Sequence, residues 1–137
     1  MQKLTIFTDG GARGNPGPAA IGVVIYDEQD NEMSTLSESI GIATNNIAEY
    51  KAIVRALEHT ATIVDDTKAV KITLKLDSQL CQRQLNGEYK VKDATLKIHY
   101  GEVKALEQEY ASIEYVHVKR ELNKVADALV NKALDAL

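Results

Sequence analysis

The sequence predicts an α/β fold in which helices cover a mixed five-stranded sheet. Apolar, β-branched runs in the first 42 residues are separated by short polar or glycine-rich turns, which favours an antiparallel start. Beyond residue 44, helix-like and strand-like periodicities alternate, which is typical of a sheet covered by helices. The expected order is βββαβααβα. With 137 residues and 45% apolar composition, we expect a single globular domain spanning residues 1–137.

The first three expected strands come from the start of the chain. Residues 4–8 form an apolar run that ends at Asp9, before the glycine- and proline-rich loop of residues 10–18. Residues 20–26 are apolar and β-branched, and after a polar turn residues 32–42 return beside them. This pattern predicts that the first three strands are antiparallel neighbours.

The remaining elements alternate between helix and strand. Apolar residues at helical spacing predict a helix over 45–61, with Thr44 as its N-cap. Residues 70–76 alternate between apolar and polar side chains, which predicts a strand, and Asp77 follows on its polar face. Two helices over 78–85 and 95–110, a strand over 113–119, and a last helix with an apolar stripe from Leu122 to Leu137 complete the order.

Composition argues against several classes of protein. Sixteen Lys and Arg against twenty Asp and Glu give a formal charge of −4, unlike a protein that holds nucleic acid or a membrane by positive charge alone. One Phe and no Trp argue against an aromatic platform for single strands. The lone Cys81 suits a reducing compartment, and no run resembles a signal peptide or a membrane span. We therefore expect a soluble, cytoplasmic protein.

Four acidic residues stand where chemistry could occur. Asp9 and Asp77 each follow a predicted strand, and ligands collect outside the carboxyl ends of strands in α/β sheets. Glu49 and Asp127 lie on the flanks of two predicted helices, each one turn after an asparagine. Each acid also has a structural interpretation, as a turn or cap residue after a strand or as a solvated residue on a helix flank. Sequence spacing alone does not bring the four together.

Four short segments form an ordered set of motifs. Residues 8–18 read Thr-Asp-Gly-Gly-Ala-Arg-Gly-Asn-Pro-Gly-Pro, and residues 44–49 read Thr-Asn-Asn-Ile-Ala-Glu. Asp-Ser-Gln follows at 77–79, and the segment 123–127 begins with Asn and ends with Asp. In this order the set resembles the signatures of the type 1 ribonuclease H family, over essentially the whole chain. The resemblance implies the ribonuclease H-like fold, whose element order matches the one expected here.

The resemblance also implies an active site. In this family the four acids bind two Mg²⁺ or Mn²⁺ ions, and the RNA strand of RNA/DNA hybrids is hydrolysed to 5′-phosphate and 3′-hydroxyl ends. By the resemblance, Asp9 bridges both ions, Asp127 binds the first, and Glu49 and Asp77 bind the second. The chemistry is reasonable because clustered carboxylates repel one another unless cations neutralise them, and hard oxygen ligands suit Mg²⁺.

The resemblance further implies contacts with a hybrid duplex. Four residues would lie along the RNA minor groove, where 2′-hydroxyls are displayed: Gly10, Gly11, Asn45 and Gln79. Asn15 and Asn46 fall in the same signatures and either contact the DNA strand or serve as turn and cap residues. The expected partner is the hybrid, with no membrane and no obligate protein partner, and we expect a monomer.

Two stretches depart from the family pattern. Many members carry a histidine-containing loop before the last helix, but residues 118–123 contain no histidine. The role of that histidine is therefore dispensable here, or it is performed by Arg120, Glu121 or solvent. A basic, Trp-containing protrusion is replaced by residues 86–94, which carry two lysines, so we expect weak hybrid affinity with a shallow salt dependence. The chain resembles a short form of the family without an added hybrid-binding domain.

Two other functions stay open at this point. The absent histidine favours a non-catalytic module that binds hybrids or RNA. A related nuclease that prefers double-stranded RNA or another duplex is also compatible with the fold, because one fold hosts several activities.

Overall fold

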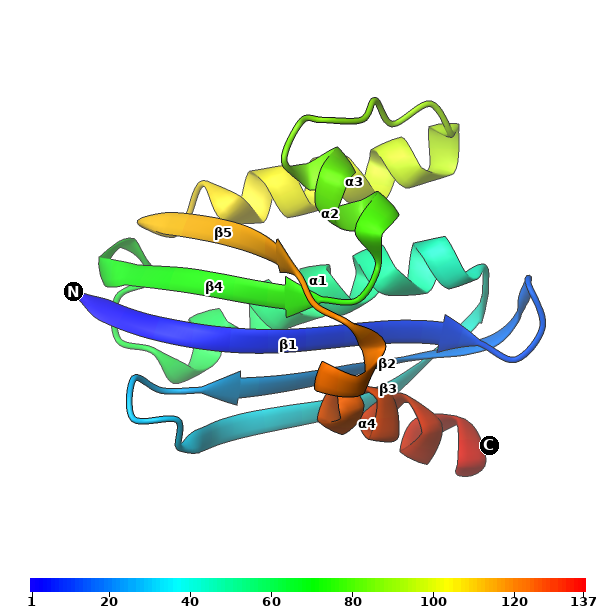
Figure 1. Cartoon of the computed structure of the whole chain (residues 1–137), viewed down its shortest axis with the longest axis horizontal. Helices are drawn as coiled ribbons and strands as arrows, with labels where there is room; N and C mark the ends of the chain where they lie inside the picture. The colour runs from blue at the N-terminus through cyan, green and yellow to red at the C-terminus, as the bar shows by residue number, and fades with distance from the viewer.

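The computed structural model describes all 137 residues and contains one five-stranded sheet in the order β3-β2-β1-β4-β5 (Figure 1). The strands are β1 (Gln2–Ala12), β2 (Gly17–Tyr26), β3 (Glu32–Ala43), β4 (Val70–Leu76) and β5 (Ser112–His117). The first three pair antiparallel, whereas β4 runs parallel to both β1 and β5. The predicted mixed sheet and its antiparallel start are confirmed.

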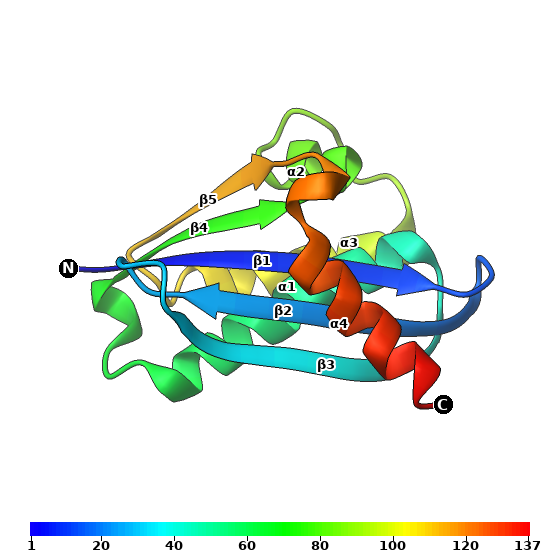
Figure 2. The same cartoon turned by 60° about the horizontal axis from the view of Figure 1, so that its bottom comes forward.

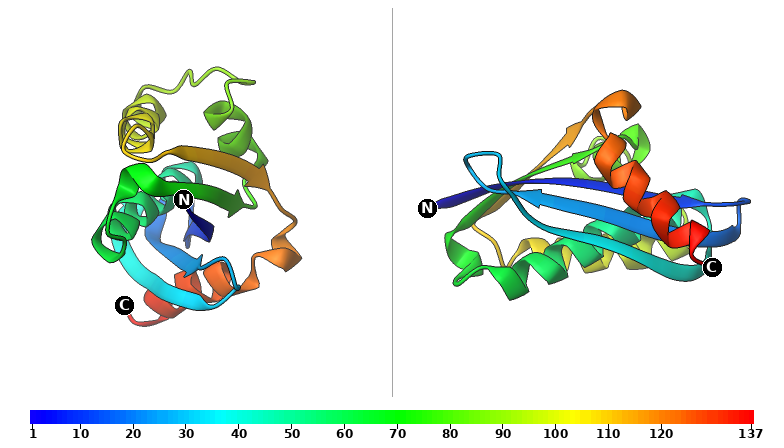
Figure 3. Two further views of the ribbon diagram at one scale, coloured as in Figure 1. Left: turned by 90° about the vertical axis from the view of Figure 1, so that its left-hand side faces the viewer. Right: turned by 90° about the horizontal axis from the view of Figure 1, so that it is seen from below.

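Helices cover both faces of the sheet. They are α1 (Asn45–Ile63), α2 (Gln79–Leu85), α3 (Ala94–Glu107) and α4 (Lys124–Asp135), with 3₁₀ turns at Thr67–Ala69 and Arg120–Leu122. One face is covered by α1 and α3, and α4 crosses the other face over β1, β2 and β3 (Figures 2 and 3). The order βββαβααβα is therefore confirmed. None of these helices has the length and apolar character needed to cross a bilayer.

The main core lies between the sheet and α1. In β4 the alternating pattern places Val70, Ile72, Leu74 and Leu76 inward, each at most 2% exposed, and Lys71 outward. Tyr50, Ile53 and Leu57 of α1 meet them at helical spacing and are fully buried. Each side chain of this size contributes about 1.5–3 kcal/mol when it leaves water, so this layer holds β1, β4 and α1 in fixed relative positions.

Strand β1 is longer than the sequence predicts. Its pairing with β2 continues past Asp9 through Gly10 and Gly11 as far as Ala12, so the predicted strand end at Asp9 is wrong. Glycine is needed at Gly10 because a Cβ there would overlap the carbonyl group of Ala48. Helix α1 can thus pack directly on the strand backbone, and Asp9 lies inside a central strand.

Helix α4 buries fewer apolar residues than the predicted stripe over residues 122–137. Leu122 precedes the helix, in the 3₁₀ turn, and is 66% exposed. The buried contacts come about once per turn, from Ala126, Val130 and Leu134. Small residues suit this packing because a Cβ on Gly22 of β2 would overlap the carbonyl oxygen of Ala126. The helix therefore lies very close to the sheet along a narrow line.

Candidate active site

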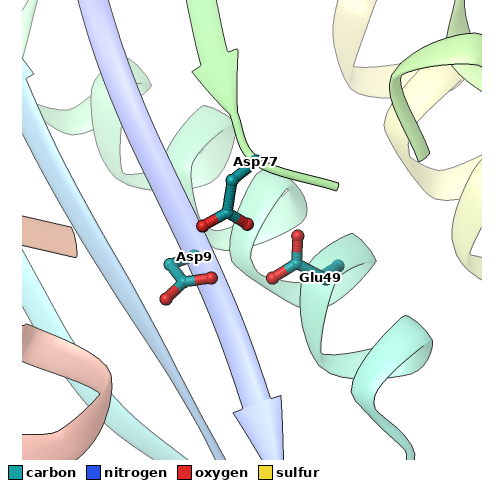
Figure 4. Close-up of side chains that lie close together, drawn as sticks. All are labelled: Asp9, Glu49 and Asp77. Atoms are coloured by element: carbon teal, nitrogen blue, oxygen red, sulfur yellow. The ribbon is translucent and has the colours of Figure 1, made fainter. Parts of the chain in front are cut away.

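Three carboxylates converge near the carboxyl ends of β1 and β4 (Figure 4). Asp9 comes from β1, Glu49 from α1, and Asp77 directly follows β4. One oxygen of each lies within 4.8 Å of the others. The parallel register brings Asp9 and Asp77 together, because Thr8 stands opposite Leu76. Three segments far apart in the sequence thus build one acidic cluster.

The start of α1 orients Glu49 toward the strand. As predicted, Thr44 is the N-cap: its hydroxyl accepts a hydrogen bond from the amide of Ile47 at 3.2 Å. Glu49 follows one turn after Asn45, and its Oε1 accepts a hydrogen bond from the amide of Gly10 at 2.7 Å. The close packing of α1 on Gly10 therefore carries the Glu49 carboxylate to a position beside Asp9.

Burial and mutual repulsion make the cluster costly to ionise. Asp9 and Glu49 are each 8% exposed. Burial raises the pKa of Asp9 to about 7; a hydrogen bond with Glu49 opposes the rise, and the charges of Asp77 and Asp127 add to it. Burial is the main reason that the pKa of Glu49 lies well above its usual range, and the charge of Asp9 is the second reason. A divalent cation would relieve this repulsion, and three carboxylates suit a hard cation.

Asp127 lies at the same edge but outside the cluster of three. It occupies the first turn of α4, is exposed, and lies close enough to Asp9 to raise the pKa of that carboxyl. Asp127 and Asp9 both line a groove of about 210 Å³. The other polar or small residues around this groove are Gly10, Gly11, Ala12, Arg13, Asn45, Arg120 and Asn131.

The residues predicted to contact substrate surround two hollows. Gly10, Gly11 and Asn45 line the groove between Asp9 and Asp127. Asn15, Asn45 and Asn46 line a second hollow of about 480 Å³, where α1 and α3 both begin. Gln79 is exposed at the start of α2, two residues after Asp77. The structure thus places Gly10, Gly11 and Asn45 beside Asp9 and Asp127, while the contacts of all these residues with a duplex stay predictions.

No histidine belongs to the carboxylate cluster. His59 contacts Ser34 at 2.7 Å, and His117 is exposed at the end of β5. His99 lies on α3, and its Nδ1 is 2.9 Å from Glu102 on the same helix. The i, i+3 spacing of this pair is visible in the sequence.

Two asparagines of the site were not among the predicted site residues. The side chain of Asn123 is buried between the 3₁₀ turn and α4, and its Nδ2 donates to the carbonyl oxygen of Thr8 at 2.9 Å. Asn131 donates to the carbonyl oxygen of Asp127 at 3.2 Å. The sequence signals for Asn123 are its place as the first residue of the fourth motif and its position one turn before Asp127 at the start of an amphipathic helix.

The chain is similar to known proteins over nearly its whole length. A family described as reverse transcriptase-like matches residues 7–133. The structure of LC11-RNase H1, isolated from compost by a metagenomic approach, is 47% identical and superposes with a TM-score of 0.93, covering 99% of this chain and 98% of that one. The chain belongs to the type 1 ribonuclease H family. LC11-RNase H1 has also been solved in complex with an RNA/DNA hybrid, in a structure whose sequence is 45% identical to that of this chain.

The relatives of this chain differ in length. The structure of RNase H1 from Halobacterium salinarum is 38% identical, with a TM-score of 0.93 over 98% of this chain and 99% of that one. The curated ribonuclease HI of H. salinarum is 40% identical over 97% of this chain but 65% of its own length. The bifunctional protein Rv2228c of Mycobacterium tuberculosis is 36% identical over 98% of this chain. The chain spans about a third, 36%, of that relative.

Proposed function

We propose that this protein is a metal-dependent endoribonuclease that hydrolyses the RNA strand of RNA/DNA hybrids, leaving 5′-phosphate and 3′-hydroxyl ends. The observation that carries the proposal is the carboxylate cluster of Asp9, Glu49 and Asp77, within 4.8 Å of one another, in a chain of the ribonuclease H family. The hybrid bound to LC11-RNase H1 supports the substrate class.

The donor set supports two Mg²⁺ or Mn²⁺ ions as cofactors. Asp9 would bridge them, Asp127 would bind the first, and Glu49 and Asp77 would bind the second. Bound ions supply an activated water and stabilise the leaving oxygen in phosphodiester hydrolysis. The chain's own part is to hold these carboxylates at one edge of the sheet and to leave a groove beside Asp127 in which a phosphodiester group of the duplex can reach them.

The groove between Asp9 and Asp127 has the chemistry to read RNA. Gly10 and Gly11 leave the backbone open to close approach along one wall. The Oδ1 of Asn45 accepts from the amide of Ala12 at 2.9 Å, so its Nδ2 is left to donate to a 2′-hydroxyl. Gln79, exposed beside Asp77, offers a second amide. These positions argue against a purely DNA substrate.

The second hollow suits the DNA strand. Two helices begin there, and helix N-termini carry a partial positive charge that attracts phosphate. At α3 the Asp93 carboxylate, which caps the helix and lines the same hollow, opposes this attraction, so the N-terminus of α1 is the stronger site for a phosphate. The Oδ1 of Asn15 accepts from the amide of Asn45 at 2.9 Å, which leaves its Nδ2 free to donate, and the side chain of Asn46 is exposed. Both asparagines can thus act as turn or cap residues and also contact a phosphate.

Arg120 is the best candidate among the alternatives to the missing histidine. It lines the groove with Asp9 and Asp127 and makes no salt bridge, whereas Arg13 pairs with Asp135 at 2.5 Å. Glu121 instead lines a separate apolar pocket with Phe7 and Val24. Arg120 therefore has the position and the free charge to contact the scissile phosphate or the product.

The test is cleavage of labelled hybrid, RNA duplex and DNA duplex by wild type and D9N, each with Mg²⁺ or Mn²⁺. We expect the wild type to cut the RNA of the hybrid and D9N to be inactive yet folded. D65N, which removes an exposed acid away from the site, is the matched control and should remain active. Cleavage retained by D9N contradicts the proposal, as does binding without cleavage by the wild type; preference for RNA duplex would indicate the related nuclease.

A further inference from the structure

Asn123 occupies an unusual position at the start of α4. It is the N-cap residue, where an asparagine side chain ordinarily accepts a hydrogen bond from the first turn of its own helix. Here the side chain makes no such bond. Its Nδ2 reaches across to the sheet and donates to the carbonyl oxygen of Thr8 at 2.9 Å. The side chain of Asn123 thus contacts β1 instead of capping α4.

That contact joins the two sides of the active site. Thr8 directly precedes Asp9 in β1. The carbonyl oxygen of Asn123 accepts the amide of Asp127 at 3.1 Å, the first helical bond of α4. One buried residue therefore connects the backbone beside Asp9 to the helical turn that carries Asp127.

The arrangement carries a cost in stability. Asn123 is 1% exposed, and its Oδ1 has no hydrogen-bond partner. A buried acceptor left without a partner is destabilising. A serine at this position could cap α4 without burying such an acceptor, but it could not reach Thr8.

Two further contacts hold α4 to the sheet, and both involve strands other than β1. Ala126, which directly precedes Asp127, lies against Gly22 of β2, and the hydroxyl of Ser37 in β3 donates to the carbonyl oxygen of Leu129 at 2.6 Å. The far end of the helix is held by Asp135 and Arg13. At the N-terminal turn, the hydrogen bond to the sheet is the one from Asn123.

We infer that Asn123 is a positioning residue that sets Asp127 against Asp9 and thereby tunes metal affinity. The inference rests on the proposed function, since it assumes that both carboxylates bind the metal. Residues that orient metal ligands typically change metal affinity by about 10–100-fold when they are replaced.

The experiment compares wild type, N123S and T60V by Mg²⁺ titration calorimetry, Mg²⁺-dependent melting temperature, and kinetics on the hybrid. N123S can cap α4 but is too short to reach Thr8. T60V removes another buried hydrogen bond, from Thr60 to the carbonyl oxygen of Ala56, far from the acids. We expect N123S to weaken Mg²⁺ binding about 10-fold or more, with KM for the hybrid unchanged, and T60V to bind Mg²⁺ like wild type.

A double variant tests whether Asn123 acts through Asp127. D127N should weaken Mg²⁺ binding by itself, and N123S should add little in that background. Wild-type Mg²⁺ affinity in N123S, or an equal loss in both backgrounds, overturns the inference. N123L replaces N123S if the latter does not fold. If the wild type binds Mg²⁺ without cutting the hybrid, the proposed function fails while the Mg²⁺ affinities of these variants still decide the role of Asn123.

Discussion

The two sides of the acidic edge are held in different ways. Asp9, Glu49 and Asp77 belong to β1, α1 and the end of β4, which share the main core. Asp127 belongs to α4, which meets the opposite face of the sheet through small residues and a few polar contacts. The core side therefore fixes its carboxylates by packing, whereas the α4 side depends on single contacts that individual substitutions can remove.

The largest expected effect comes from G10A, on the core side. The added Cβ would overlap the carbonyl group of Ala48 and approach the amide of Glu49, so α1 must move away from β1. We expect a loss of about 3 kcal/mol or more in the free energy of unfolding, with loss of cleavage. G101A, whose Cβ meets nothing within 4 Å, is the control and should unfold no earlier than wild type in urea.

The next effect is the pH dependence of the metal-free protein. Because folding raises the pKa of Asp9 from 3.8 to about 7, the folded state binds the proton more tightly than the unfolded chain. The contribution of Asp9 to stability is therefore fully present below about pH 4 and is lost as the pH rises toward 7, by on the order of 3 kcal/mol. Glu49, whose pKa is also raised by burial, acts in the same direction. Urea unfolding in EDTA across this range measures the slope.

Two comparisons isolate the contribution of Asp9 to that slope. D9N should show a smaller decline, and saturating Mg²⁺ should remove most of it in the wild type. Glu38, whose pKa is lowered by its hydrogen bond to Arg55, acts in the opposite direction but equally in both proteins. The prediction is contradicted if the wild type gains more stability than D9N between pH 4 and pH 7.

A smaller effect is expected from G22A, on the α4 side. The added Cβ would overlap the carbonyl oxygen of Ala126 and displace the helix, and with it Asp127. We expect a cost of about 1–3 kcal/mol and a fall in cleavage rate of about 100-fold, since small displacements of catalytic groups have large kinetic effects. Calorimetry should still detect Mg²⁺ binding by the other three acids. Unchanged cleavage would show that α4 tolerates the displacement.

The smallest expected effect is on the salt dependence of hybrid binding. The stretch between α2 and α3 carries Lys90 and Lys92, and Lys97 lines the same hollow as Lys90 and Tyr89. We expect K90A/K97A to lower hybrid affinity modestly and to reduce the slope of log affinity against log salt by about 1–2. Fluorescence anisotropy over a salt series measures this slope. A slope unchanged from wild type would place the duplex away from this hollow.

Local patterns predicted most of the fold. The alternation over residues 70–76 and the stripe through Tyr50 and Leu57 are periodic signals, and periodicity follows directly from which face is buried. The ordered motifs identified the family. The extent of β1 was missed because Gly10 looks like a loop residue until its neighbour, the backbone of α1, is known.

The site was predictable only in part. The sequence named the acids, and the fold was needed to bring Asp9, Glu49 and Asp77 within 4.8 Å. The hydrogen bond from Asn123 to Thr8 joins residues 115 positions apart, so no periodic pattern in the sequence reveals it. The exposure of Leu122 was missed for a similar reason, since a helical stripe does not reveal where a helix begins.

The place of Asp9 inside β1 has a consequence for local opening of the structure. Its neighbours Thr8 and Gly10 pair with β2, and Thr8 also pairs with β4, so releasing this segment requires breaking the centre of the sheet. Fluctuations that fray a helix end would free Asp127 long before they free Asp9. Amide hydrogen exchange at Asp9 should therefore proceed only through global unfolding, so the residue at the centre of the site also reports the stability of the whole domain.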